Sequence, residues 1–161
     1  MKNRQLNTLG RPEFVAVMAC LISLEALAID SMLPALAHIG SDLHISYAND
    51  RQLIITSIFL GVALGVLGYG MAGDSLGRKR PIYFGLFVFV LGSILCAYSE
   101  NFTFMLLGRM LQGFGAAGPY VLSTALIRDL YKGKQMAEIM SLVVMIFILV
   151  PAIAPLLGQG I

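Results

Sequence analysis

The sequence predicts an all-α integral membrane protein built as a bundle of helices that cross a bilayer. Of its 161 residues, 58% are hydrophobic and only 12% are charged, and the mean hydropathy is +0.83. A bilayer-spanning helix needs about 20 mostly apolar residues, and the chain contains several runs of that order. Lys and Arg gather on alternate connections between the runs, as is typical of cytoplasmic loops. The small net charge of +2 gives no indication of a nucleic-acid partner.

Five membrane helices account for most of the chain, and we expect one N-terminal transmembrane bundle over residues 1–161. The helices are expected at residues 13–36, 51–72, 82–99, 103–127 and 137–161. The first run follows a basic N-terminus and could be mistaken for a secretory signal. It is longer than the apolar part of a signal, Glu25 interrupts it, and further runs of membrane length follow it. We therefore interpret it as a retained first helix.

The distribution of cations predicts a cytoplasmic N-terminus. In that orientation nine of the eleven Lys and Arg residues face the cytoplasm. They are Lys2, Arg4, Arg11, Arg78, Lys79, Arg80, Arg128, Lys132 and Lys134. Of the other two, Arg51 lies at the outer edge and Arg109 lies inside the membrane. The chain is thus expected to be a multi-pass protein of the cytoplasmic (inner) membrane.

Neither a metal site nor a catalytic site is expected. The histidines and acids of the first outer loop, at 38–50, are explained better by a solvated polar loop than by a metal site. Cys20 and Cys96 fall within apolar runs, where a thiol serves as a small packing residue. No nucleophile with a base, metal-ligand cluster or phosphate loop is found, so we expect a protein that is not an enzyme.

A polar stretch at residues 70–81 separates the second apolar run from the third. It combines glycines for a tight bend, a proline to open the next helix and three consecutive cations. Its residues Gly70, Asp74, Gly77, Arg78 and Lys79 follow the order G-x-x-x-D-x-x-G-R-K. This resembles the loop signature of the major facilitator superfamily. The chain departs from the signature at Ser75, where the family usually has Arg, and at Ala72, where it usually has Leu.

The run at 103–127 is rich in small residues. Residues 113–118 match a dinucleotide-binding fingerprint, but no strand precedes them, so we reject that interpretation. Small residues in a membrane helix instead allow a neighbouring backbone to approach closely. The residues expected to do so are Gly108, Gly113, Ala116, Ala117 and Gly118 in this run, and Gly61 and Gly65 in the second.

Arg109 lies inside the same run and must face protein or water. A charge at mid-membrane costs about 2.5 to 3.5 kcal/mol even on the gentler scales. Arg109, Gln112 and Gly113 share one face of their helix by their spacing. Residues 109–117 resemble the fourth-helix pattern R-x-x-Q-G-x-G-A-A of proton-coupled members of the superfamily.

Glu25 and Asp30 are the acids inside the first run, and depth counting relates them to the fourth helix. At 1.5 Å per residue, Asp30 lies near the level of Arg109 and Glu25 near that of Gln112. Our hypothesis is that Asp30 or Glu25 gives and takes a coupling proton while Arg109 and Gln112 respond to its charge. The alternative is a structural ion pair that holds the first and fourth helices together.

Residues 30–36 resemble the first-helix pattern of the drug/proton antiporter branch, and more narrowly the bicyclomycin-resistance-like group. The inner end of the fourth helix, residues 126–130, is similar to that group as well. By this resemblance Asp74, Arg78 and Asp129 form a charge cluster at the inner ends of the second and fourth helices. An exposed and energetically weak ion pair is the alternative.

The fifth run carries a worn form of the antiporter signature G-x-x-x-G-P-x-x-G-G. Pro155 and Gly158 match it, and three of its glycines are replaced. A proline within a span can also do no more than kink the helix.

Together these resemblances imply the start of the N-terminal half of a major facilitator drug/proton antiporter with twelve helices. Helix six and the C-terminal half are expected to lie outside residues 1–161. The implied function is proton-coupled efflux of drugs or other small amphipathic compounds, with no cofactor besides the proton gradient. The implied partners are the substrate, protons, the bilayer and the other half. A non-transporting fragment or subunit and a sugar or metabolite symporter are the alternatives.

Overall fold

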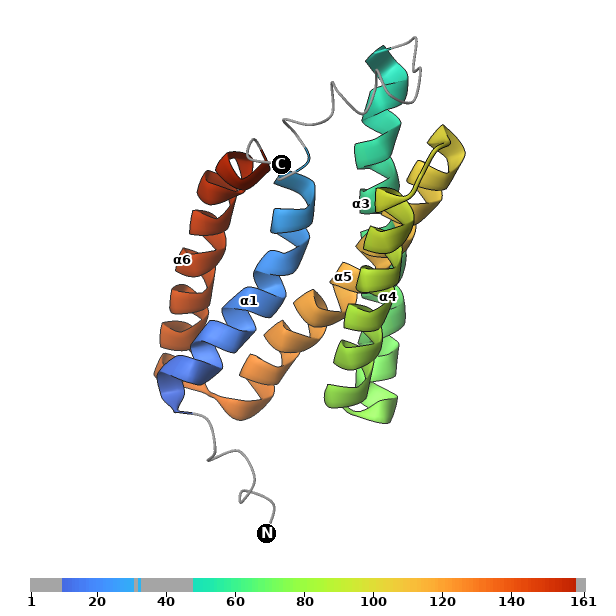
Figure 1. The fold of residues 1–161 in the computed structure, drawn as a ribbon. Coiled ribbons are helices and arrows are strands. Elements are labelled where there is room, and N and C mark those ends of the chain that lie inside the picture. The colour runs from blue at the N-terminus through green and yellow to red at the C-terminus, as the bar shows by residue number, and fades with distance from the viewer. Residues whose placement is uncertain (1–9, 31, 33–47, 159–161) are drawn as a thin grey trace.

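The computed structural model of the chain describes residues 10–30, 32 and 48–158, with side chains at 10, 12–30, 32 and 52–149. Over these residues the chain is all-α, without a strand (Figure 1). The helices are α1 (Arg11–Asp30), α3 (Ala48–Leu76), α4 (Lys79–Ala97), α5 (Phe102–Leu130) and α6 (Gly133–Gly158). The predicted fold class and the order of five helices are confirmed.

Two glycines with positive φ lie at helix boundaries. The second helix was expected to end at residue 72 but continues to Leu76, where Gly77 with a φ of +80° follows it. That left-handed conformation favours glycine and stops a helix. Gly133, with a φ of +56°, is the first residue of α6, three positions after the end of α5 at Leu130. The tight bend predicted at Gly77 is therefore present.

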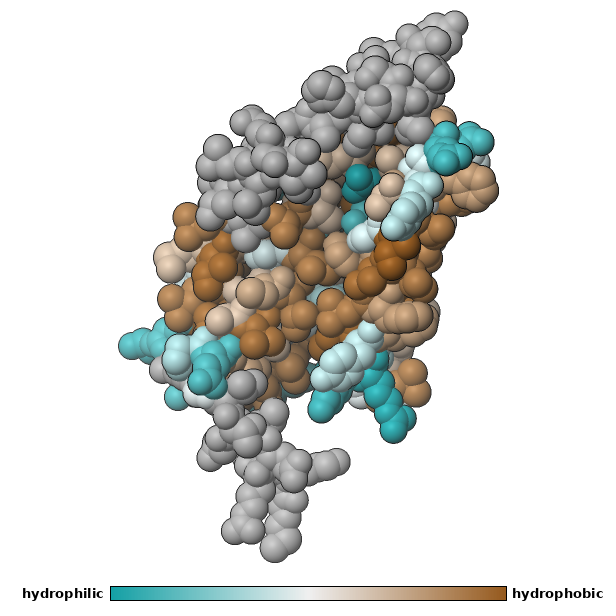
Figure 2. Space-filling view, in the orientation of Figure 1, coloured by the Kyte–Doolittle hydropathy of each residue, from teal (hydrophilic) through white to brown (hydrophobic). Residues whose placement is uncertain are grey.

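Among the described residues, three helices have the length and the apolar composition needed to cross a membrane. These spans are Pro12–Asp30, Gln52–Leu76 and Lys79–Ala97. Large apolar side chains such as Leu60, Leu67 and Phe87 are exposed on the outside of the bundle. Figure 2 shows brown hydrophobic side chains across the middle of this face, with most teal hydrophilic residues toward its ends. Such a surface suits hydrocarbon as its solvent.

Helix α5 runs through the centre of the bundle, between the pair α1 and α6 and the pair α3 and α4 (Figure 1). Its backbone touches that of α3. A Cβ atom on Gly61 would collide with the carbonyl oxygen of Met110, and one on Gly113 with that of Ile58. The close approach predicted for these glycines is confirmed. Gly85 and Gly92 of α4, which the sequence did not single out, also bring the backbone of α4 into contact with that of α5.

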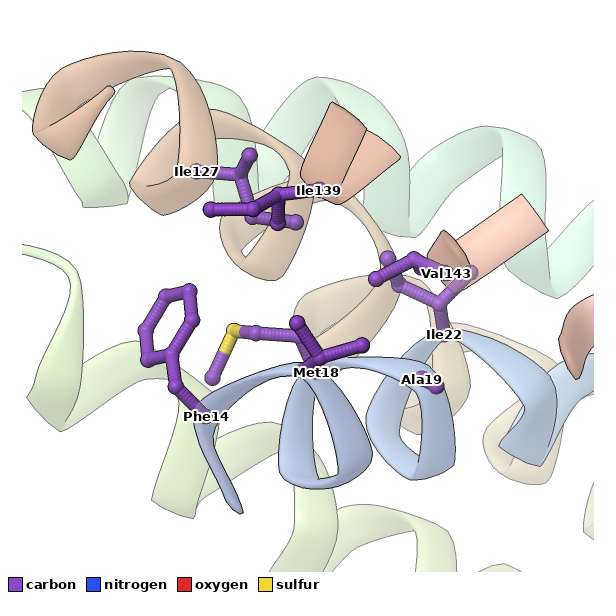
Figure 3. Close-up of a cluster of buried hydrophobic side chains, with 8 residues drawn as sticks. Phe14, Met18, Ala19, Ile22, Ile127, Ile139 and Val143 are labelled. Carbon is purple, nitrogen blue, oxygen red and sulfur yellow. The ribbon is translucent and has the colours of Figure 1, made fainter. Parts of the chain in front are cut away.

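A cluster of buried apolar side chains joins α1, α6 and the inner part of α5 (Figure 3). Its members are Phe14, Val15, Met18, Ala19, Ile22, Ile127, Ile139 and Val143. On α1 these residues recur at spacings of three and four, so they form one face of the helix. This cluster fixes the inner half of α1 and positions the acids further along the same helix.

Candidate functional site

A chain of hydrogen bonds links α5 to α4 in the interior of the bundle. The Nη1 of Arg109 donates to the Oε1 of Gln112 at 2.9 Å. The Nε2 of Gln112 donates to the Oγ of Ser93 at 2.9 Å, and Ser93 in turn donates to the carbonyl oxygen of Phe89 at 2.9 Å. Gln112 is only 7% exposed. The guanidinium thus obtains a neutral amide as its partner, and its buried Nε has no hydrogen-bond partner in the described part of the chain.

The local sequence explains why these groups meet. Arg109 and Gln112 are three residues apart and therefore lie on the same face of α5. On α4, a Cβ atom at Gly92 would lie 2.5 Å from the backbone nitrogen of Gln112. On α5, a Cβ atom at Gly108 would lie 2.8 Å from the Sγ of Cys96. Because small residues let the two helices touch, the short Ser93 side chain reaches Gln112.

Arg109 and Gln112 face a cavity of about 510 Å³ between α1, α4 and α5. We call it the arginine cavity. It is lined by Leu24, Leu27, Ala28, Phe89, Ser93, Cys96, Ala97, Met105, Arg109 and Gln112. Most of the wall is apolar. Its polar side chains, Ser93, Arg109 and Gln112, come from α4 and α5.

Glu25 and Asp30 face a different cavity, of about 370 Å³, between α1, α3, α5 and α6. We call it the acidic cavity. It is lined by Glu25, Ala26, Ile29, Asp30, Phe59, Val62, Tyr120 and Phe147. Both acids are partly buried there. A carboxylate pair beside three aromatic rings inside a membrane-length bundle is chemically suited to hold a proton or an amphipathic cation.

The two cavities lie on opposite faces of α1. Residues 24, 27 and 28 line the arginine cavity, and residues 25, 26, 29 and 30 line the acidic one. Each residue turns the helix by about 100°, so these two sets point in opposite directions. The structure thus brings Glu25 and Asp30 together and Arg109 and Gln112 together. No ion pair joins Arg109 to either acid among the described residues.

The three charged residues that the sequence groups at the inner end lie together. The Nη1 of Arg78 is 3.1 Å from the Oδ1 of Asp74, and its Nε is 3.0 Å from the Oδ2 of Asp129. Arg78 is 25% exposed, and the two acids are 75% and 52% exposed. Arg78 therefore bridges the inner ends of α3 and α5, while the neighbouring Lys79 lies over the ring of Tyr83 at 6.0 Å.

A third cavity, of about 390 Å³, borders this cluster. It is lined by Arg78, Tyr120, Val121, Thr124, Ala125, Arg128 and Asp129. Tyr120 lines this inner cavity and the acidic cavity alike. The tyrosine therefore lies between the cluster of Arg78 and Asp129 and the two acids.

Within its described residues, the structure shows no contact that would assign a role to the remaining candidate residues. Gly70 and Gly77 have nothing within 4 Å of a Cβ position. Pro155 and Gly158 fall in the part of α6 whose side chains lie outside the described residues. The outer loop at 38–47 lies outside the described residues altogether. Cys20 and Cys96 are free thiols. No group of three His, Cys, Asp or Glu suited to a metal occurs in the part of the chain that the structure describes.

Sequence reasoning missed Ser93 and the aromatic wall of the acidic cavity. Ser93 is the one serine in α4, which is a usable signal once the close contact of α4 with α5 is known. Phe59, Tyr120 and Phe147 carried no signal, because aromatic residues are common in apolar membrane runs. Their place around the acids follows from the packing of α3, α5 and α6.

A bundle of membrane-length helices whose interior holds an arginine, two acids and their cavities has the architecture of a multi-pass membrane transporter. Residues 18–161 match the Major Facilitator Superfamily. The chain belongs to that superfamily. The predicted membership is therefore confirmed.

Relatives with known names agree with this assignment. The chain is 37% identical over 145 residues to an uncharacterized MFS-type transporter, YdgK, of Bacillus subtilis. It is 36% identical over 148 residues to a bicyclomycin resistance protein homolog of Haemophilus influenzae, and 35% identical over 148 residues to the multidrug resistance protein MdtL of Escherichia coli. These matches cover 90 to 91% of the chain but only 36 to 37% of each relative. The likeness to the bicyclomycin-resistance-like group is confirmed.

Proposed function

We propose that these residues are part of a transporter that exports drugs or other small amphipathic compounds across the cytoplasmic membrane in exchange for protons. The observation that carries the proposal is the acidic cavity, where Glu25 and Asp30 face three aromatic side chains. The relatives named for bicyclomycin and multidrug resistance support the class of substrate. We place the N-terminus in the cytoplasm on the distribution of Lys and Arg.

The chemistry of the acidic cavity suits an exchange of protons for substrate. Carboxyl groups inside a membrane are expensive and mark proton or substrate pathways. Glu25 or Asp30 would bind a proton in one state and release it in the other. The rings of Phe59, Tyr120 and Phe147 would hold the apolar part of the substrate, and a cationic group would lie near the carboxylates. The proton gradient would supply the energy, without a cofactor.

The arginine cavity supports this cycle from the other side of α1. Gln112 and Ser93 hold Arg109 against α5, so its charge does not neutralise either acid through a direct ion pair. Coulomb interaction still acts over the width of one helix in a low-dielectric interior. A movement of α1 relative to α5 would change that interaction and with it the proton affinity of the acids.

The inner charge cluster would hold one conformation of the transporter. Arg78 joins the end of α3 to the end of α5 through Asp74 and Asp129. Release of these contacts would let the two helices separate on the cytoplasmic side. This role comes from the resemblance to the family loop and is supported by the two ion pairs.

The proposal is tested by neutralising each acid in the complete native protein. Drug efflux driven by a proton gradient is measured in proteoliposomes for wild type, Asp30→Asn and Glu25→Gln. We expect at least one variant to lose its response to the proton gradient, because an amide side chain does not bind and release a proton at physiological pH. Transport that stays fully proton-coupled in both variants would contradict the proposal. Proton-driven uptake of a sugar or metabolite would instead indicate a symporter.

A further inference from the structure

We infer that Ser93 of α4 is a positioning residue for transport, which fixes the orientation of the Gln112 amide and through it the guanidinium of Arg109. The inference rests on the proposed function. Ser93 faces the arginine cavity and touches neither acid of the acidic cavity. Its side-chain bond to another helix is the one that it accepts from Gln112, so we expect its effect on transport to pass through that bond.

The donors and acceptors of this chain fit together in only one direction. Arg109 carries only donors, so Gln112 must turn its oxygen toward the guanidinium. The amide nitrogen then points to α4, where it needs an acceptor. Ser93 donates its own proton to the carbonyl oxygen of Phe89 at 2.9 Å, and its oxygen remains free to accept from Gln112. The orientation of the amide is thus fixed from both ends.

Close packing keeps Ser93 in this place. Gly92, its neighbour, lies directly against the backbone of Gln112. Gln112 is only 7% exposed, and the Ser93 hydroxyl is the acceptor that α4 presents to its amide nitrogen. Without the hydroxyl, the amide could rotate and turn its nitrogen toward the arginine. Two donors would then face each other, and Arg109 would lose its partner.

Ser57 of α3 provides a matched control. It is also a partly buried serine in a membrane helix, and its Oγ donates to the carbonyl oxygen of Ile54 at 2.8 Å. This bond stays within α3, and within the described residues Ser57 makes no hydrogen bond to another helix. Ser93 differs because it accepts a bond from α5. A loss of transport specific to Ser93 would therefore report on the contact between helices.

The test compares Ser93→Thr with Ser93→Val in the complete native protein. The two side chains have nearly the same shape, and only threonine keeps the hydroxyl. We expect Ser93→Val to lower the rate of proton-driven efflux about tenfold, the factor that corresponds to one buried hydrogen bond. Ser93→Thr should keep most of the wild-type rate, and Ser57→Val should resemble wild type. Thermal unfolding of each purified variant checks that the protein is folded.

A double-mutant cycle shows whether the effect passes through Gln112. In a Gln112→Ala background, Ser93→Val should cause no further loss. Equal transport by Ser93→Thr and Ser93→Val, or losses that multiply in the double variant, would overturn the inference. Wild-type protein without proton-driven transport would instead contradict the proposed function. Failure of the positioning role alone leaves wild-type coupling intact, so the two failures are distinguishable.

Discussion

The charged residues of the site lie on opposite sides of α1. Glu25 and Asp30 face the acidic cavity, and Arg109 faces the arginine cavity with Gln112 as its partner. An arginine in direct contact with an acid would hold it as a carboxylate. Under the proposed function, separation from Arg109 by one helix would leave the acids free to exchange protons.

The sequence predicts the residue types of this site but not their directions. The cost of a charge in the membrane singles out Arg109, Glu25 and Asp30 without a structure. Counting residues from a helix end gives depth, but it does not give the rotation of one helix about its axis relative to another. That rotation decides which face of α1 meets Arg109, and in the structure the two acids lie on the opposite face. Ser93 was missed because one hydroxyl in an apolar run is ordinary, and only the contact with Gln112 distinguishes it.

Tyr120 is expected to affect substrate binding through its ring. It lines both the acidic cavity and the inner cavity. Tyr120→Phe should keep the drug KM near that of wild type, because the ring remains. Tyr120→Ala should raise KM about tenfold, corresponding to the loss of one aromatic contact. The measurement is drug transport against concentration in proteoliposomes.

Tyr83 serves as the control for this comparison. It is 61% exposed on α4, away from both cavities. Tyr83→Ala should leave KM unchanged. An equal rise in KM for Tyr83→Ala and Tyr120→Ala would show that the effect of Tyr120 is not specific to the cavities.

At the scale of helices, glycine contacts determine how close α3 and α4 lie to α5. The pattern of small residues in α5 predicted close packing, and the contacts of Gly61 and Gly113 bear this out. The sequence did not predict which helix would meet each glycine, since one face of α5 touches α3 and another touches α4. The second helix, expected to end at residue 72, ends at Leu76, because the left-handed Gly77 follows there.

Gly113→Ala should destabilise the protein by about 1 to 3 kcal/mol, because its methyl group would meet the carbonyl oxygen of Ile58 on α3. The same substitution at Gly68 provides the control. A Cβ atom there would meet only the ring of Phe114, at 4.0 Å. Thermal unfolding of the purified variants should show a loss for Gly113→Ala and none for Gly68→Ala. Equal stability of the two variants would contradict the packing described here.

The inner charge cluster should matter more for transport than for stability. Both carboxylates are more than half exposed, and ion pairs of this kind contribute about 0 to 1 kcal/mol. Asp129→Asn should therefore leave the unfolding temperature almost unchanged. Its efflux rate should fall, because Arg78 would lose its charged partner on α5.

Lys132→Ala, on the exposed connection to α6, is the control for a change of charge. The efflux rate of this variant should match that of wild type. A wild-type rate in Asp129→Asn would remove the proposed conformational role of the cluster. A large loss of stability would show instead that the ion pair is structural.

At the scale of the whole molecule, membership of the Major Facilitator Superfamily is established over residues 18–161. The chain spans 36 to 37% of the length of the relatives named above. Transporters of this architecture carry their substrate sites between repeated helical units. The acidic cavity would be one side of such a site, and the expected C-terminal half would supply the other. Substrate choice depends on both sides and therefore could not be predicted from residues 1–161.

We propose that drug and protons move in opposite directions through the complete protein. The most direct measurement uses the complete native protein in proteoliposomes with an imposed pH gradient. With an acidic lumen, drug should accumulate inside, and adding drug outside should raise the pH of the lumen as protons leave. Drug flux that ignores the gradient, or drug and protons that move in the same direction, would contradict the account.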